Sequence, residues 1–352
     1  MVRKFKLRLL LGNFKDKASI LKASLSTKRR TASIRLSVIR ATTRTSTSPP
    51  PEHRIDAILA YGHNNRLTAS ACIHAIMDRI HKTRNVYVVF KCLIIVHNII
   101  TRGSFILKDQ LSIYPSTGGR NYLNLSMFND KSNVKTWEFS AWVRWYARFL
   151  ELNLMTSRVL GSSVSSSANS SIKNIKDFEN LSGLLSSDLV KECTALVDIV
   201  DEICRIPDGS ITQQNNLVYE AMKLISEDYR STQQKMYSRL TELDDRVDGL
   251  NPGELDELIN CLGKVEECKE RLVVLFVNRK RHDAFWELIS QTKTNFLRVK
   301  KEREIVLAIS ESTQLEKRVG TPSLLLSRLL PHAGKWLKAE STYIVTVSTA
   351  RT

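Results

Sequence analysis

The chain has 352 residues, of which 42% are hydrophobic, so it can bury a sizeable core and its length predicts two or three structural units. Only 13 Gly and 8 Pro favour a largely helical protein over a turn-rich sandwich or barrel. The net charge is +17, and residues 1–54 hold 14 Lys and Arg against Asp16 and Glu52, which is 14 − 2 = +12 of that total. Charge concentrated in this way indicates a surface that meets a polyanion, either nucleic acid or an anionic membrane.

Several classes of protein are excluded by the motifs. The six cysteines are dispersed without a CxxC pair, and the histidines lack HExxH spacing, so neither a disulfide framework nor a metal site is expected. The Gly-Gly-Arg sequence at 118–120 lacks the context of a nucleotide-binding loop, so we expect a protein that is not an enzyme and has no cofactor. The most apolar stretch, 86–100, is interrupted by Lys91 and His97 and falls short of the ~18 apolar residues of a membrane span. We expect a buried helix there, in a cytoplasmic protein with reduced cysteines.

A basic amphipathic helix is predicted at the N-terminus. Its apolar residues follow i, i+3, i+4, i+7 spacing, and they are Leu7, Leu10, Leu11, Phe14, Ala18, Leu21 and Leu25. The cations Arg8, Lys15, Lys17 and Lys22 fall largely off that stripe, and Lys4 and Lys6 belong to the same basic helix. Such a helix can lie at a lipid interface with Leu7, Leu10, Leu11 and Phe14 inserted. The alternative is that the stripe packs on the rest of the protein while the lysines stay solvated.

Composition divides the remaining chain. Three consecutive prolines make 44–54 an extended linker. Shorter helices follow to about residue 158, with 86–101 as the central one, and the Ser-rich stretch 161–171 indicates a flexible connection. Longer helical stripes come next, and Asn251, Pro252 and Gly253 separate two of them into a predicted helical hairpin. The predicted units are an N-terminal helix (1–24), a first helical half (25–160), a linker (161–174), a long-helix half (175–305) and a mostly disordered tail (306–352).

Four segments resemble a known family in their order and spacing. They are RATTRTSTSPPPEHRIDAIL (40–59), VYVVFKCLIIVHNIITRGSFILKDQL (86–111), GGRNYLNLSMFND (118–130) and WEFSAWVRWYARFLELNL (137–154). Together they resemble the ANTH domain of endocytic clathrin assembly proteins, particularly its plant members, over about residues 25–300. The resemblance implies an all-α fold, with a right-handed superhelical solenoid followed by a bundle of longer helices.

The same resemblance implies a binding site for phosphatidylinositol 4,5-bisphosphate. The family motif is a Lys, then Ala-Thr-Thr, a short linker and a Lys-rich cluster closed by a His. Arg40 occupies the first basic position and His53 the closing one, while Arg44 and Arg54 flank the middle. The chain has Pro49 to Glu52 where the family places its lysines, so we expect diffuse electrostatics and helix insertion to matter more than a tight head-group pocket.

The partners implied by the resemblance are a phosphoinositide membrane, clathrin and vesicle SNARE helices. The expected location is peripheral on the membrane of clathrin-coated pits, clathrin-coated vesicles or the Golgi apparatus. Two alternatives stay open from the residues themselves. A basic helical protein could bind nucleic acid, although Phe5 and Phe14 are the only aromatics before Tyr61 that could stack on bases. A helical scaffold that binds only proteins is the other alternative.

Overall fold

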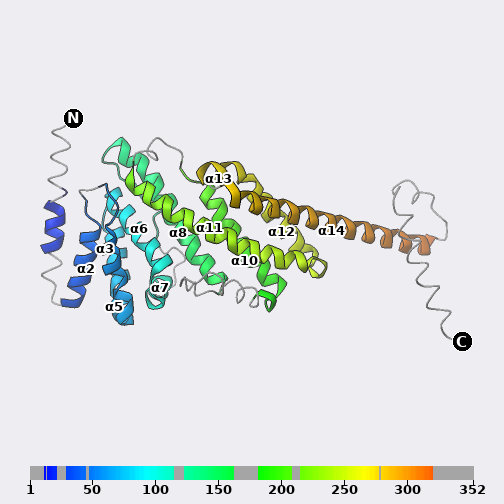
Figure 1. The fold of residues 1–352 in the computed structure, drawn as a ribbon, viewed down its shortest axis with the longest axis horizontal. Coiled ribbons are helices and arrows are strands. Elements are labelled where there is room, and N and C mark those ends of the chain that lie inside the picture. Colours follow the sequence, from blue (N-terminus) through cyan, green and yellow to red (C-terminus); the bar gives the residue numbers. More distant parts are fainter. Residues whose placement is uncertain are drawn as a thin grey trace. The chain divides into compact units, whose positions relative to one another are not determined.

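The computed structural model describes residues 12, 14–21, 29–44, 47–114, 123–161, 181–207, 215–276 and 279–319. Within these ranges every regular element is a helix and no strand is present (Figure 1). The predicted all-α fold class is therefore confirmed. None of the helices in these ranges is both long and apolar enough to cross a membrane.

A short helical segment over residues 14–21, hereafter the N-terminal helical segment, precedes the labelled helices. The helices of the first half are α2 (Arg29–Ala41), α3 (Glu52–Leu59), α4 (Tyr61–Asn64), α5 (Arg66–His81), α6 (Val86–Arg102), α7 (Phe105–Ser112) and α8 (Val134–Val159). Those that follow are α10 (Ser186–Cys204), α11 (Asn216–Asp245), a 3₁₀ turn (Val247–Gly249), α12 (Pro252–Glu267), α13 (Lys269–Leu275) and α14 (Arg279–Val319). Polar side chains cap the N-termini of several helices. The capping residues include Asn65, Asn85, Ser104, Asn133 and Asn251.

Helix α6 is the centre of the core, as its apolar sequence predicts. Every residue from Val88 to Ile99 is buried, and the helix packs against α5, α8 and α11. The ring of Phe90 lies 4.9 Å from that of Phe139 and 5.2 Å from that of Tyr146, measured between centroids. The first residue of α6 is also tied to the loop before α8, because the Val86 amide donates to the Asp130 carboxylate at 3.0 Å. Two of the segments that carry the family resemblance thus build one core.

The longer helices pack around α10, which contacts α8, α11 and α12. The break at Asn251 is confirmed, because its side chain and that of Glu254 form a reciprocal capping box at the start of α12. Helix α12 packs mainly on α10 and not along α11, so the predicted simple hairpin of two helices is wrong. The apolar stripes of α11 and α12 both meet α10, which sequence periodicity cannot reveal because it reports a face and not the partner.

The chain divides into two compact units, Met1–Phe296 and Leu297–Thr352. The predicted linker at 161–174 lies almost entirely outside the described residues, but α8 and α10, which flank it, pack together within the first unit. In the second unit the helix continues to Val319, so the tail predicted from 306 is helical over its first part. Side chains over 304–311 are mostly exposed, so the helix shows no apolar stripe although its Ala, Leu, Glu and Lys residues favour helix. The rest of the predicted tail lies outside the described residues.

Candidate anion-binding site

The segment between α2 and α3 forms a corner near the N-terminus of the first unit. Helix α2 ends at Ala41, and the buried Thr42 hydroxyl donates to the Val38 carbonyl at 2.7 Å. Pro51 has the extended backbone that three prolines impose, and α3 begins directly after it at Glu52. The Arg54 amide donates to the Pro51 carbonyl at 2.9 Å, which closes the first turn of α3. The linker therefore turns back and α3 packs on α2.

This corner brings two of the predicted lipid ligands together. The guanidinium group of Arg54 donates a hydrogen bond to the backbone carbonyl of Arg40, across the linker. Arg40 is exposed in the last turn of α2, and His53 is exposed in the first turn of α3 beside Arg54 in sequence. Two arginines therefore come from adjacent helix ends, which gives the corner a cationic surface, and arginines suit bidentate contacts with phosphate.

The acidic residue in the middle of the motif has a partner. The carboxylate of Glu52 is paired with the guanidinium group of Arg102 at the end of α6. The same guanidinium group lies 3.5 Å from the Asp56 carboxylate. All three side chains are substantially exposed, so the pairs contribute little to stability. Their consequence is electrostatic, because Arg102 offsets the negative charge that Glu52 brings to the corner.

Arg44, another predicted ligand, is engaged elsewhere. Its guanidinium group lies 2.5 Å from a carboxylate oxygen of Asp16, and its amide donates to the other oxygen at 2.7 Å. Arg79 on α5 also donates to Asp16 at 3.2 Å. Sequence reasoning did not identify Asp16 or Arg79 as functional residues. The one visible signal was Asp16 itself, the lone acid among the cations of residues 1–51.

Lys91 is a buried cation close to Arg79. Lys91 on α6 is 2% exposed, and its ammonium group donates to the Thr43 carbonyl at 2.9 Å. Burial lowers the pKa of Lys91 to about 8, against the nearby Asp16 carboxylate, which raises it, while the charges of Arg54 and Arg79 act with burial. The sequence marked Lys91 only as an interruption of an apolar stretch. Its role is to hold the chain just after α2 against the core.

The N-terminal helical segment shows its apolar residues to solvent. Phe14 is 75% exposed and Leu21 65% exposed, and Lys15 and Ala18 are exposed as well. Phe14, Ala18 and Leu21 belong to the predicted apolar stripe, so the described part of that stripe is exposed. The other residues predicted for this surface lie outside the described residues, and they are Lys4, Lys6, Leu7, Arg8, Leu10, Leu11 and Lys22.

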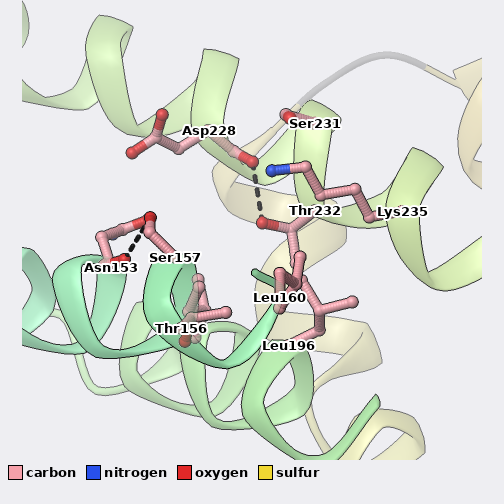
Figure 2. A pocket seen from close by; sticks show the side chains of 10 residues that line it. Asn153, Thr156, Ser157, Leu160, Leu196, Asp228, Ser231, Thr232 and Lys235 are labelled. Carbon is pink, nitrogen blue, oxygen red and sulfur yellow. Dashed lines mark hydrogen bonds between the residues drawn. The ribbon is translucent and has the colours of Figure 1, made fainter. Parts of the chain in front are cut away.

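A small pocket lies between α8, α10 and α11 (Figure 2). Its volume is about 40 Å³, enough for a few water molecules, and its lining includes Asn153, Thr156, Asp228 and Lys235. This space is too small for an inositol phosphate. The residues that the structure describes also contain no cluster of three His, Cys, Asp or Glu side chains that could hold a metal ion.

Comparison with known proteins agrees with the helical architecture. Residues 33–290 match the ANTH domain family. The chain is 43% identical to "Putative clathrin assembly protein At4g40080" of Arabidopsis thaliana over 81% of this chain and 79% of that protein. It is 31% identical to "Putative clathrin assembly protein At5g10410" of the same plant, over 85% and 88% of the two chains. A third Arabidopsis protein, "Putative clathrin assembly protein At5g65370", is 29% identical over 82% of this chain and 99% of its own length.

The family match covers well over half of the chain and includes the α2–α3 corner, the central helix α6 and the helices packed around α10. The first of these relatives is similar over most of both sequences. On these grounds, this chain belongs to the ANTH domain family.

Proposed function

We propose that the protein is a peripheral membrane adaptor that binds phosphatidylinositol 4,5-bisphosphate through its basic N-terminal region and promotes assembly of a clathrin coat. The single observation that supports this most strongly is the extended similarity to proteins named clathrin assembly proteins. In this proposal clathrin and the phosphoinositide membrane are the partners, and the step is vesicle budding in endocytosis or Golgi traffic. Vesicle SNARE helices are a further proposed partner.

The proposed lipid site is the cationic surface at the α2–α3 corner. Arg54 is fixed beside the end of α2 by its bond to the Arg40 carbonyl, so two guanidinium groups come from adjacent helix ends. The pairing of Glu52 with Arg102 limits the repulsion that a phosphate would meet there. Membrane affinity then comes from this surface together with insertion of the exposed apolar residues of the N-terminal helical segment.

Vesicle co-sedimentation tests the proposal. The full chain is mixed with neutral vesicles, vesicles with phosphatidylserine, and vesicles with phosphatidylinositol 4,5-bisphosphate at matched charge, in about 0.15 M salt. We expect the phosphoinositide vesicles to bind most protein. Replacing Arg40 and Arg54 together with Gln should remove the preference for the phosphoinositide more than it reduces total binding. The His53→Gln variant measures the share of the histidine in that preference.

The controls discriminate the alternatives. A double Arg66→Gln, Arg84→Gln variant carries the same loss of charge on α5 and the α5–α6 loop. Equal binding to neutral and phosphoinositide vesicles would rule out the lipid proposal, and tight binding to duplex DNA or RNA without vesicle binding would favour the nucleic-acid alternative. Coat formation is tested separately, by the assembly of purified clathrin on phosphoinositide vesicles that carry the protein.

A further inference from the structure

The carboxylate of Asp16 occupies a set of donors that suits a phosphate group. It receives the Arg44 amide at 2.7 Å, the Arg44 guanidinium group at 2.5 Å and the Arg79 guanidinium group at 3.2 Å. The side chains of Asp16, Arg44 and Arg79 are 10%, 16% and 9% exposed. Two guanidinium groups and a backbone amide around one oxyanion are a typical way in which proteins bind phosphate.

The arginines do not depend on Asp16 alone for their positions. The guanidinium group of Arg79 also donates to the Thr42 carbonyl at 2.9 Å and to the Thr42 hydroxyl at 3.3 Å. The Thr42 hydroxyl in turn donates to Val38, so α2 and α5 hold Arg79 between them. A donor group fixed in this way stays preorganised when its anion is exchanged, which favours binding of another anion.

The charges at this site do not balance. Arg44, Arg79 and Lys91 bring three cations close together, while Asp16 supplies the carboxylate contacts that the structure describes for them. The neighbouring acid on α5, Asp78, faces Arg35 at 3.9 Å and Lys82 at 2.8 Å. One carboxylate against three cations, 3 − 1 = +2, leaves an excess that a multiply charged phosphate neutralises better than a single acid.

The N-terminal helical segment is docked by its acid. Asp16 is buried while Phe14 and Leu21 lie largely in solvent, so the contacts of Asp16 with Arg44 and Arg79 are polar contacts that hold this segment against the rest of the first unit. Once it has left, Phe14, Ala18 and Leu21 remain on one face and are available to a lipid interface.

We propose that Arg44 and Arg79 form a phosphate site for an inositol phosphate head group, and that Asp16 occupies this site as an internal competitor. Binding of the phosphate displaces Asp16 and releases the N-terminal helical segment. This site adjoins the Arg40 and Arg54 surface, because Arg44 belongs to the same motif, and it adds Arg79 of α5 to the predicted ligands. The proposal rests on the proposed function only where it takes a membrane lipid as the source of the phosphate. The phosphates of soluble inositol trisphosphate have the same chemistry and do not require a membrane.

The first test compares Asp16→Asn with Glu270→Gln, which removes one exposed acid from α13. Titration calorimetry with soluble inositol 1,4,5-trisphosphate measures the site without a membrane. Asp16→Asn should bind about tenfold more tightly than the wild type, since the competing charge-assisted bonds are gone. Glu270→Gln should bind like the wild type, and adding Arg79→Gln to Asp16→Asn should abolish the gain. Equal affinity in Asp16→Asn and Glu270→Gln, or a gain that survives Arg79→Gln, overturns the proposal.

The second test needs no substitution. Hydrogen exchange of the wild-type amides over residues 14–21 is followed with and without inositol trisphosphate. The proposal requires faster exchange in this segment when the ligand is bound, while α6 stays protected. Unchanged or slower exchange at saturating ligand contradicts it, even if a variant fails to fold.

Vesicles separate this proposal from the proposed function. If the wild type ignores phosphoinositide vesicles but Asp16→Asn binds inositol trisphosphate through Arg79, the internal competitor stands and the membrane function fails. If the wild type binds the vesicles and Asp16→Asn binds neither ligand more tightly, the membrane function stands and the competitor fails.

Discussion

The imidazole of His97 joins two parts of the first unit: its Nε2 atom lies 2.9 Å from the Asp228 carboxylate on α11, and its Nδ1 atom 2.7 Å from the Tyr146 hydroxyl on α8. His97 is fully buried. A neutral ring with its proton on Nε2 satisfies both contacts, because it donates to the carboxylate and accepts from the hydroxyl. One side chain of the central helix therefore ties the first helical half to the longer helices.

Replacing His97 with Ala should lower the free energy of unfolding by about 2–4 kcal/mol, because it leaves a cavity and removes the partners of a hydroxyl and a carboxylate. Urea denaturation followed by circular dichroism measures the change. His81→Ala, at an exposed histidine of α5, is the matched control and should change stability by less than about 0.5 kcal/mol. Similar losses in the two variants would show that the His97 contacts do not carry this stability.

A second prediction concerns the acid within the basic motif. Glu52→Lys places a cation where the family has its lysine cluster, and we expect about tenfold tighter binding to phosphoinositide vesicles. The new repulsion from Arg102 costs little because that side chain is exposed. The gain should shrink at high salt, as expected of an exposed electrostatic contact.

The control for Glu52→Lys is Glu270→Lys, which changes the net charge equally on α13, well away from α3 in Figure 1. An equal gain from both variants would mean that net charge and not the corner determines binding.

Sequence patterns predicted the elements that are determined by residues close together in the chain. The apolar run of α6 predicted a buried central helix, and Asn251, Pro252 and Gly253 predicted where α12 begins. Both signals depend on residues within a few positions of one another, through side-chain burial and capping. The helical continuation of α14 to Val319 was missed because exposed helices lack an apolar stripe.

The candidate site was only partly predictable for the same reason. Arg40, His53, Arg54 and Arg44 stand together in one motif, but Asp16 and Arg79 meet although 63 positions separate them. Periodicity indicated that residues 14–21 are amphipathic, without indicating that Asp16 would be buried and Phe14 and Leu21 exposed. Such a pairing depends on tertiary packing, which a single sequence does not encode in any local pattern.

The exposed apolar stripe leads to a third prediction. The double variant Phe14→Ser, Leu21→Ser should keep the stability of the wild type, because neither side chain is buried. Its binding to phosphoinositide vesicles should fall about tenfold or more, since each inserted side chain contributes about 1–2 kcal/mol at a lipid interface. Leu67→Ser, at a leucine of α5 that is 82% exposed, is the control for the loss of surface apolar area. Undiminished vesicle binding by the double variant would exclude insertion of this stripe.

The last prediction follows from the burial of Lys91. Its pKa is lowered from the ordinary 10.5 to about 8, so between these pH values the unfolded chain keeps a proton that the folded chain has lost. Stability from this group must therefore rise with pH across that window, by at most about 3 kcal/mol. Lys91→Met removes the titration and keeps much of the side-chain volume, so comparison with it cancels the contributions of other groups.

In urea denaturation at pH 7 and pH 10, the free energy of unfolding of the wild type should therefore increase relative to that of Lys91→Met. The rise comes from the ammonium group, which is held against the Thr43 carbonyl at a cost in desolvation that disappears when it loses its proton. A difference between the two proteins that stays constant with pH would mean that Lys91 keeps its ordinary pKa.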